Sequence, residues 1–255
     1  ESSAQDALTA ADDAVELTDE ARQTADTAGA AADEATDVAA EATQQAAAAA
    51  EETSEDVAET ATETAEAAAD AATEAAEEAS TAADNAMATA EAATEAYAEA
   101  RRTAARYVNA RSADEVIFTS GATESDNLAI KGIARARKHQ GNHIITTNVE
   151  HPAVLASCKQ LEDEGFKTTL LEVTKDGIDP DELEKAITPK TILVSIMHVN
   201  NETGQIFPIN KLAEIVKIKC QRSNVNCPLF HSDGVQALGK LPIDLANIDL
   251  YSLSG

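Results

Sequence analysis

The chain has 255 residues and a formal net charge of −27, which is distributed very unevenly. Residues 1–100 hold 27 of the 46 acidic residues and one of the 19 basic ones, giving 1 − 27 = −26, so residues 101–255 carry 18 − 19 = −1. This distribution argues against a salt-adapted protein, which is acidic throughout, and the lack of a basic stripe argues against nucleic acid as a partner.

The cysteine count and the hydropathy indicate a cytoplasmic protein without membrane association. The three cysteines, Cys158, Cys220 and Cys227, are too few for a disulfide framework, and their odd number fits a reducing compartment. No run of about 18 large apolar residues is present, and no signal peptide opens the chain. We expect the three thiols to be buried or incidental, and we predict no metal site.

Residues 1–96 form an acidic low-complexity segment. Of the first 100 residues, 41 are Ala, and most of the others are Glu, Asp or Thr. Ala and Glu favour helix, but acidic neighbours such as Glu51 and Glu55 repel by about 0.2–0.5 kcal/mol per pair. We therefore expect either a marginal, salt-sensitive helix or disorder. Three roles stay open: a solvated tail, an acidic spacer or partner-binding arm, and a segment foreign to the rest of the chain.

From about Tyr97 the composition changes, and β-branched runs alternate with helical patterns. This alternation predicts an α/β domain over residues 97–255, with a mainly parallel sheet and flanking helices. The predicted strands are Val116–Thr119, His143–Thr147, Thr168–Val173, Thr191–Met197, Leu229–Ser232 and Asp249–Leu253. The predicted helices are Thr123–Gln140, Pro152–Glu164, Asp179–Ala186 and Ile209–Arg222.

Polar clusters follow several of the predicted strands. In open α/β sheets, ligands bind beyond the carboxyl ends of the strands, so these clusters are the candidate site. They are Ser120–Glu124, Asn148–His151, His198–Glu202, Asp233–Gln236 and Ser252–Gly255.

The turn that leads into the first predicted helix of this domain has two interpretations. Ser120, Gly121 and Ala122 are small, and the free N–H groups of the helix that they open, with the Thr123 hydroxyl, can hold a phosphate. The same residues are also typical of an ordinary strand-to-helix turn with a Thr or Ser cap. The turn by itself does not decide between the two.

Asp233 and His151 also allow a chemical and an ordinary interpretation. Asp233 lies at a predicted strand end, where a carboxylate can pair with a protonated ring nitrogen of a cofactor or can cap a turn. His151 follows Glu150 and precedes Pro152 at a helix start, where it can stack on a planar cofactor and move protons or make local hydrogen bonds.

The motifs taken together are far more specific than any single one. Residues 97–255 closely resemble the cysteine desulfurases, which are pyridoxal-phosphate enzymes of the class V aminotransferase group. The matching segments, in order, are Phe118–Asn127 (FTSGATESDN), Thr147–His151 (TNVEH), His198–Gly204 (HVNNETG), His231–Asp233 (HSD), Gly239–Asp244 (GKLPID) and Ser252–Gly255 (SLSG).

The resemblance implies part of the large domain of a fold-type I pyridoxal-phosphate enzyme. It implies that Ala122, Thr123 and Ser254 hold the cofactor phosphate and that His151 stacks on the pyridine ring and acts in proton transfer as the catalytic residue. It also implies that Asp233 keeps the ring nitrogen protonated. In addition, Asn201 and Gln236 are expected to form hydrogen bonds near the phenolic oxygen of the ring.

The resemblance further implies an enzyme that removes sulfur from L-cysteine. Its products are L-alanine and a persulfide on an enzyme cysteine, which supplies iron–sulfur cluster or thio-cofactor assembly. The implied partners are a second copy of the chain in a homodimer and a sulfur-acceptor or iron–sulfur scaffold protein.

Several family elements are missing from this sequence. In the family, Ser-x-Ser-Gly is followed by His-Lys, whose lysine forms the Schiff base, whereas this sequence reaches only Gly255. Lys240 lies in the GKLPID segment and is no substitute. The persulfide cysteine and the Asn-Ala-Thr-Thr-Pro-like opening segment are absent too. We therefore expect this chain to be an incomplete fragment that is inactive alone.

Two other functions stay open at this stage. A selenocysteine lyase-like enzyme fits the same motifs, given the Asn200–Gly204 variant and the extra residues around Cys220–Pro228. A non-catalytic interaction protein, in which the acidic arm is the working part and the α/β domain a degenerate scaffold, is the alternative from a different class. Comparing turnover on cysteine with turnover on selenocysteine separates the first from a desulfurase.

Overall fold

The protein was analysed as a computed structural model, which describes residues 55–223 and 226–254 together with scattered residues between 23 and 44. The described residues divide into two compact units, with the boundary between Arg101 and Arg102. Most of residues 1–54, and therefore much of the predicted low-complexity segment, lie outside the described residues. A domain boundary between residues 96 and 97 stays a prediction.

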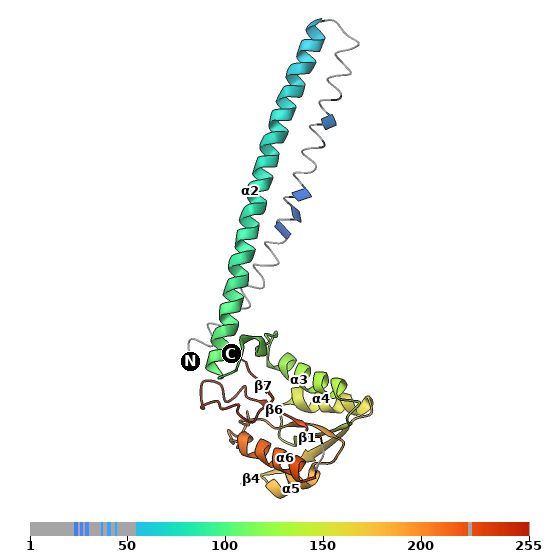
Figure 1. Ribbon diagram of the computed structural model, residues 1–255, viewed down its shortest axis with the longest axis vertical. Coiled ribbons are helices and arrows are strands. Elements are labelled where there is room, and N and C mark those ends of the chain that lie inside the picture. The colour runs from blue at the N-terminus through green and yellow to red at the C-terminus, as the bar shows by residue number, and fades with distance from the viewer. Residues whose placement is uncertain are drawn as a thin grey trace. The chain divides into compact units, whose positions relative to one another are not determined.

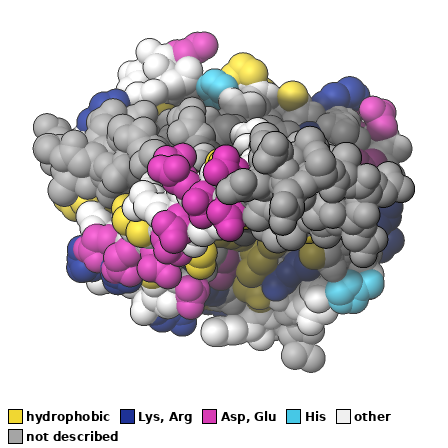
Figure 2. All heavy atoms as spheres, turned by 90° about the horizontal axis from the view of Figure 1, so that it is seen from above, with side chains coloured by type: hydrophobic (Ala, Val, Ile, Leu, Met, Phe, Trp, Pro, Cys, Tyr) yellow, Lys and Arg dark blue, Asp and Glu magenta, His cyan; other side chains and the backbone are white. Residues whose placement is uncertain are grey.

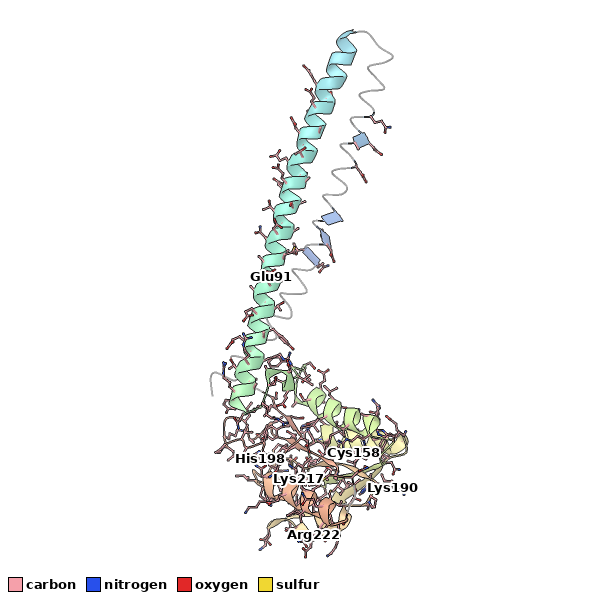
Figure 3. All side chains as sticks on the ribbon, viewed as in Figure 1. Glu91, Cys158, Lys190, His198, Lys217 and Arg222 are labelled. Atoms are coloured by element: carbon pink, nitrogen blue, oxygen red, sulfur yellow. The ribbon has the colours of Figure 1, made fainter. Side chains whose placement is uncertain are left out.

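The described part of the acidic segment is dominated by one long helix, α2, which spans Glu55–Tyr107 (Figure 1). Of the two alternatives that the composition left open, the structure has helix here. Its acidic side chains from Glu63 to Glu99 are exposed, including Glu91, which Figure 3 labels. Acidic side chains also gather near the middle of the face seen in Figure 2. Its buried side chains are alanines, and three of them, Ala86, Ala93 and Ala100, are seven residues apart, followed by Ala105.

Threonine is a weak helix former, yet α2 holds many threonines in its interior. Four of their hydroxyls donate to the backbone carbonyl four residues earlier, at 2.8–2.9 Å: Thr73 to Ala69, Thr81 to Glu77, Thr89 to Asn85 and Thr94 to Ala90. Each hydroxyl therefore finds its acceptor inside the helix and does not compete with the backbone for a non-helical conformation. This local pairing explains how the helix accommodates so much threonine.

The second unit is built on a five-stranded sheet in the order β2-β1-β5-β6-β7, and every neighbouring pair is parallel. The strands are β1 His143–Thr147, β2 Lys167–Leu171, β5 Thr191–Ser195, β6 Leu229–Asp233 and β7 Leu250–Ser252. A separate two-residue hairpin joins β3 Val173–Thr174 to β4 Gly177–Ile178.

Helices cover both faces of this sheet (Figure 1). They are α3 Ala122–Ala136, α4 Pro152–Asp163, α5 Pro180–Ala186 and α6 Ile209–Ser223. Successive residues of a strand point to opposite faces: Ile144 packs with α3 and α4, whereas Ile145 packs with α5 and α6. In β5, Leu193 and Val194 alternate in the same way. The central strands β1 and β5 are buried along their whole length.

The predicted α/β architecture, with a mainly parallel sheet and flanking helices, is confirmed. Five of the six predicted strands and all four predicted helices form, within a few residues of their predicted ends. The predicted strand Val116–Thr119 is wrong. Residues 116–119 form no strand, although Val116 is extended, and the Ile117 side chain is 69% exposed. The β-branched residues favour an extended backbone, but a strand also requires a hydrogen-bonded ladder.

Among the residues that the structure describes, no helix is long and apolar enough to cross a membrane.

Gly141 and Gly132 make a matched pair for testing the packing of this unit. A Cβ at Gly141 would collide with the backbone of Lys190, whose carbonyl oxygen accepts from the His143 N–H at 3.0 Å, at the entry to β1. We expect Gly141→Ala to lower the free energy of unfolding by about 2–4 kcal/mol, as measured by denaturant unfolding of the full-length protein.

Gly132 lies inside α3 with open space around the position of its missing Cβ, and serves as the control. We expect Gly132→Ala to raise stability by about 0.5–1 kcal/mol, because alanine is the better helix former. Equal effects of the two substitutions would contradict the close backbone contact at Gly141.

Candidate functional site

The candidate site lies at the carboxyl edge of the parallel sheet. Because all five strands run in one direction, the residues that follow them meet at one edge. Glu150 and His151 follow β1, His198 follows β5, Asp233 ends β6, and Ser254 follows β7. Figure 3 shows His198 far from Lys190, which precedes β5 at the opposite edge. The structure thus brings together the clusters that the sequence analysis singled out.

The amino-terminal part of α3 also reaches this edge. Asp126 lies in the second turn of the helix, and its Oδ1 is 3.7 Å from Nε2 of His231 in β6. The same carboxylate interacts with the hydroxyl of Ser252 in β7. Ala122 and Thr123 open the helix just before it, half-buried and exposed respectively, and the first N–H groups of a helix have no acceptor within the helix.

Asp233 is a buried carboxylate, with a side chain 7% exposed. Its Oδ1 accepts from the Val235 N–H at 3.0 Å, and its backbone carbonyl accepts from the His198 N–H at 2.8 Å. Burial raises the pKa of Asp233, while the hydrogen bond from Val235 and the nearby charge of His151 lower it in part. His151 follows β1 and Asp233 ends β6, so the two predicted site residues lie at the same edge of the sheet, with β5 between their strands.

His151 caps the amino terminus of α4. Its Nδ1 accepts from the Ala153 N–H at 3.2 Å, and Pro152 occupies the first position of the helix, where no N–H is needed. Because Nδ1 is the acceptor, the neutral imidazole carries its proton on Nε2. Nδ1 of His151 therefore makes a local hydrogen bond, as the ordinary interpretation predicts, whereas Nε2 is available for proton transfer.

The remaining predicted residues differ in how they are held. Asn201 is exposed in the turn after β5, whereas its neighbour Asn200 is buried: Nδ2 of Asn200 donates to the Val149 carbonyl, and Oδ1 accepts from the Thr203 N–H at 2.8 Å. Asn200 thereby fixes the loop that presents Asn201.

Gln236 lies just beyond Asp233, and its Oε1 accepts from Lys240 Nζ at 2.9 Å, which leaves the amide nitrogen as a donor. Ser254 is half-buried after β7. Gly255, the last member of the predicted cluster, lies outside the described residues.

The family model for "Aminotransferase class-V" matches residues 55–255, which is more than half of the chain. The chain belongs to the aminotransferase class-V family. The match begins within α2 and runs through the whole α/β unit.

Named relatives and solved structures of this family agree with the fold. The chain is 54% identical over 159 residues to "Cysteine desulfurase IscS" of Ehrlichia chaffeensis, covering 61% of this chain and 37% of the relative. It is 50% identical over 160 residues to "Probable cysteine desulfurase, mitochondrial" of Dictyostelium discoideum, covering 62% of this chain and 34% of the relative. The solved structure "SspA in complex with cysteine" superposes with a TM-score of 0.58 at 39% identity, covering 66% of this chain and 47% of that one.

This class-V chain therefore spans well under half of the length of the curated relatives it matches.

Two buried carboxylates inside the class-V motifs were not predicted as site residues from the sequence. Asp126 is 1% exposed and Glu150 is 5% exposed. Burial raises the pKa of Asp126 to about 7, and the nearby Asp233 carboxylate adds to the rise. Burial also raises the pKa of Glu150 to about 8, although its Oε1 accepts from the Met197 N–H at 3.0 Å and the Thr147 hydroxyl at 2.8 Å.

His231 links Asp126 to the neighbouring strands, and it is neutral. Its Nδ1 lies 2.8 Å from the Ser195 hydroxyl and its Nε2 lies 2.9 Å from the Ser252 hydroxyl. Complete burial lowers the pKa of His231 to about 4, so its contact with Asp126 is not an ion pair at neutral pH. Glu150 precedes a histidine and Asp126 lies near the start of a helix, and both patterns are common at protein surfaces. Only the packing therefore reveals that these two carboxylates are buried.

Tyr251 packs against His198 and Gly234 at the carboxyl edge of the sheet. Its hydroxyl lies 2.7 Å from Nδ1 of His198, and the two rings pack edge to face. Gly234 leaves the space for this ring, because a Cβ at that position would collide with the Tyr251 side chain. Gly234 and Tyr251 thus set the shape of the edge directly beside Asp233.

In the described residues, no three histidine, cysteine, aspartate or glutamate side chains are grouped so that they could hold a metal ion.

Glu150 makes the stability of the protein depend on pH. In the unfolded chain it loses its proton near the ordinary value of 4.5, whereas in the folded chain it keeps the proton to about 8. Between these values the folded state binds more protons, so the free energy of unfolding falls as the pH rises from about 4.5 to 8. We expect Glu150→Gln to flatten this fall, raising stability at pH 8 relative to wild type by on the order of 2 kcal/mol.

Part of the pH dependence of the free energy of unfolding remains in Glu150→Gln, because the raised pKa of Asp126 lowers stability in the same direction as the pH rises. Denaturant unfolding at several pH values measures the effect, and Glu214→Gln on the exposed side of α6 is the control. Glu150→Ala removes both hydrogen bonds and is expected to destabilise the fold at every pH by about 2–3 kcal/mol. An unchanged pH slope in Glu150→Gln would contradict the assignment.

Proposed function

We propose that the protein is a pyridoxal-phosphate-dependent cysteine desulfurase, to which this chain contributes the cofactor-binding part of the large domain. The observation that carries the proposal is the buried Asp233 carboxylate at the sheet edge where His151 follows β1 and that α3 also reaches. The names of the class-V relatives support the choice of cysteine desulfurase within the family.

The donor set at this edge fits the phosphate of the cofactor. The amino terminus of α3 offers the N–H groups of Ala122 and Thr123, and the Thr123 and Ser254 hydroxyls add two more donors. A helix amino terminus attracts a dianion through these N–H groups and through the helix dipole. In this proposal the turn at Ser120–Thr123 is a phosphate-binding turn as well as a helix start.

The side chains at the end of β6 fit the ring of the cofactor. Burial of Asp233 disfavours its charged form, and a protonated ring nitrogen opposite the carboxylate would offset that cost. We assign to Asp233 the task of holding a proton on that nitrogen. Pyridoxal phosphate, when bound, supplies an electron sink for bond cleavage at the substrate. Gln236 and Asn201 are assigned to the phenolic oxygen, as hydrogen-bond donors.

His151 is assigned a stacking and proton-transfer role. Its Nδ1 is already engaged with the Ala153 N–H, which fixes the ring at the start of α4 and places the exchangeable proton on Nε2. A histidine held in this way can give and take a proton at one defined atom. Its position at the carboxyl edge, where Asp233 also lies, supports its placement at the same ring.

Further features of the proposal rest on the resemblance. They are L-cysteine as the substrate, a homodimer, a sulfur-acceptor or iron–sulfur scaffold protein as the recipient, and a cytoplasmic location. The solved structure of SspA is described as a complex with cysteine, which supports a thiol amino acid as the ligand class. Free cysteines in the described residues fit a reducing compartment.

Asp233→Asn in the full-length protein tests the proposal. The amide oxygen still accepts from the Val235 N–H, so the fold is kept while the charge is lost. We expect alanine production from cysteine to fall by on the order of 10²-fold or more. We also expect a weaker visible absorbance change when pyridoxal phosphate is titrated into the protein.

Asp176→Asn, in the exposed turn between β3 and β4, is the matched control and should change neither measurement. Wild-type cofactor binding and turnover in Asp233→Asn would refute the role of Asp233. A full-length wild-type protein that binds pyridoxal phosphate but releases no alanine would instead refute the cysteine desulfurase activity.

A further inference from the structure

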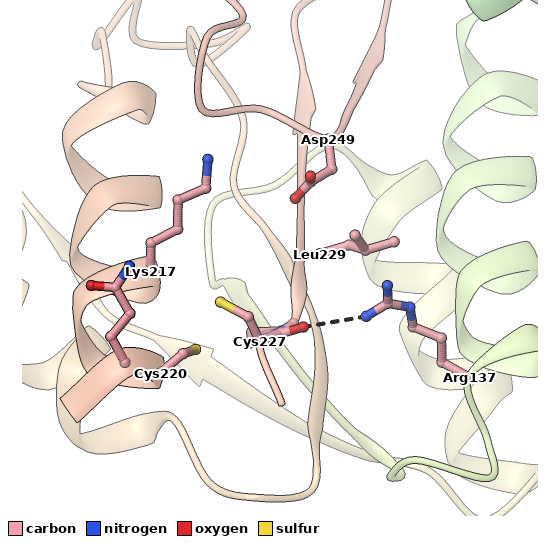
Figure 4. A pocket seen from close by; sticks show the side chains of 8 residues that line it. Arg137, Lys217, Cys220, Cys227, Leu229 and Asp249 are labelled. Carbon is pink, nitrogen blue, oxygen red and sulfur yellow. Dashed lines mark hydrogen bonds between the residues drawn. The ribbon is translucent and has the colours of Figure 1, made fainter. Parts of the chain in front are cut away.

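A hollow at the amino edge of the sheet lies at the opposite end of β6 from the candidate site. Leu229, the first residue of β6, and Asp249, which precedes β7, form one wall, and Lys217 and Cys220 of α6 form the other (Figure 4). Asp233 is the last residue of β6, so the full strand separates this hollow from the class-V motifs.

Two thiols face one another in this hollow. Cys220, in the last turn of α6, is 4% exposed, whereas Cys227 is exposed. The Cys227 sulfur lies 4.0 Å from the carbonyl oxygen of Val216, which is one helical turn before Cys220. Figure 4 shows the two sulfur atoms pointing toward each other across the hollow.

A hydrogen bond to the Cys227 carbonyl and the proline that follows fix the position of Cys227. Its carbonyl oxygen accepts from Nη1 of Arg137 at 3.2 Å, and Pro228 follows it with a restricted backbone. Arg137 and Lys217 place two cationic groups in the same lining, alongside the Asp249 carboxylate, which accepts from the Phe230 N–H at 2.8 Å. Arg137 contacts the Cys227 backbone, and Lys217 adds a second cation to the lining, so the hollow is suited to an anionic thiol reagent.

We propose that Cys220 and Cys227 form an intramolecular disulfide by exchange with an anionic low-molecular-weight disulfide, which makes this hollow a thiol-modification site separate from the class-V site. The inference does not depend on the proposed cysteine desulfurase activity, because neither thiol lies at the carboxyl edge of the sheet.

The two thiols have different parts in this exchange. Burial and the neighbouring Cys227 thiol raise the pKa of Cys220 to about 12, so Cys220 is protonated at neutral pH and is not the first nucleophile. Cys227 is the exposed thiol, and a small disulfide can reach it. Its sulfur, as the thiolate, attacks one sulfur of the small disulfide, so that a mixed disulfide forms and one small thiolate leaves.

Cys220 then loses its proton and attacks the Cys227 sulfur, which releases the second small thiolate. In total, two protein thiols are oxidised by two electrons to one disulfide, and one small disulfide is reduced to two small thiols, which take up the two protons. The product links the end of α6 to the residue before Pro228 at the start of β6.

Peptide mapping tests the proposal on the full-length protein. The protein is incubated with glutathione disulfide, its remaining thiols are alkylated, and it is digested with trypsin. Trypsin cleaves after Lys219, Arg222 and Lys240, so the two cysteines fall on separate peptides, Cys220–Arg222 and Ser223–Lys240. We expect these peptides to appear as a disulfide-linked pair that rises with the ratio of disulfide to thiol and disappears on reduction.

Variants separate the two steps. In Cys220→Ser and Cys220→Ala, the second step is blocked, and we expect the glutathione adduct to accumulate on Cys227. In Cys227→Ser we expect neither the adduct nor a linked pair at Cys220. Cys158 is an internal control, because burial raises the pKa of its thiol to about 12 and should keep it unmodified.

Two results would overturn the proposal. One is a wild-type protein in which Cys227 carries glutathione to the same extent as in Cys220→Ser, with no linked peptides. The other is a wild-type protein in which Cys227 does not react. Circular dichroism of the two Cys220 variants shows whether each is folded, and the wild-type map decides the question even where a variant is not.

Discussion

Burial of β1 and β5 on both faces is the constraint on which the rest of the α/β unit depends. Every residue of these strands is inaccessible, so alternate side chains must meet a helix layer on each side. A parallel sheet is suited to this because its crossover connections carry the helices to its faces. The common direction of the strands then gathers the residues after β1, β5, β6 and β7 at one edge, and this gathering creates the candidate site.

This arrangement buries several acidic side chains, and removing a carboxylate from water is energetically unfavourable. Asp126, Glu150 and Asp233 are all buried, and burial raises the pKa of each. The Asp233 carboxylate raises the pKa of Asp126 further, and both of these carboxylates raise the pKa of Glu150. No charged partner among the described residues offsets Asp126, since His231 beside it is neutral. Such clustered, destabilised groups are typical of sites where function is favoured over stability. A cationic ring nitrogen at Asp233 is the kind of group that relieves this cost.

The two edges of the sheet therefore serve different chemistry in our interpretation. The carboxyl edge presents helix amino termini, a buried acid and a histidine with one free nitrogen, which suits an anionic cofactor with a basic ring. The amino edge presents an exposed thiol, a buried thiol and two cationic side chains, which suits exchange with a small disulfide. α2 is built differently, from local interactions: alanine and glutamate propensity and threonine hydroxyls bonded within the helix.

The sequence by itself determined the class-V resemblance, the alternation of strands and helices, and the order of the polar clusters, because these depend on local propensity, on periodicity and on motif order. The predicted strand Val116–Thr119 was wrong, because a local preference for extended backbone does not supply the hydrogen bonds to a neighbouring strand. The sequence also left α2 undecided between helix and disorder, because the helix propensity of Ala and Glu is opposed by repulsion between acidic side chains. Only the tertiary structure decided that Asp126 and Glu150 are buried, that Asn200 fixes the loop bearing Asn201, and that Gly234 makes room for Tyr251. It also brought Cys220 and Cys227 to one hollow. Burial and contact between segments distant in sequence are properties of packing, and no local pattern records them.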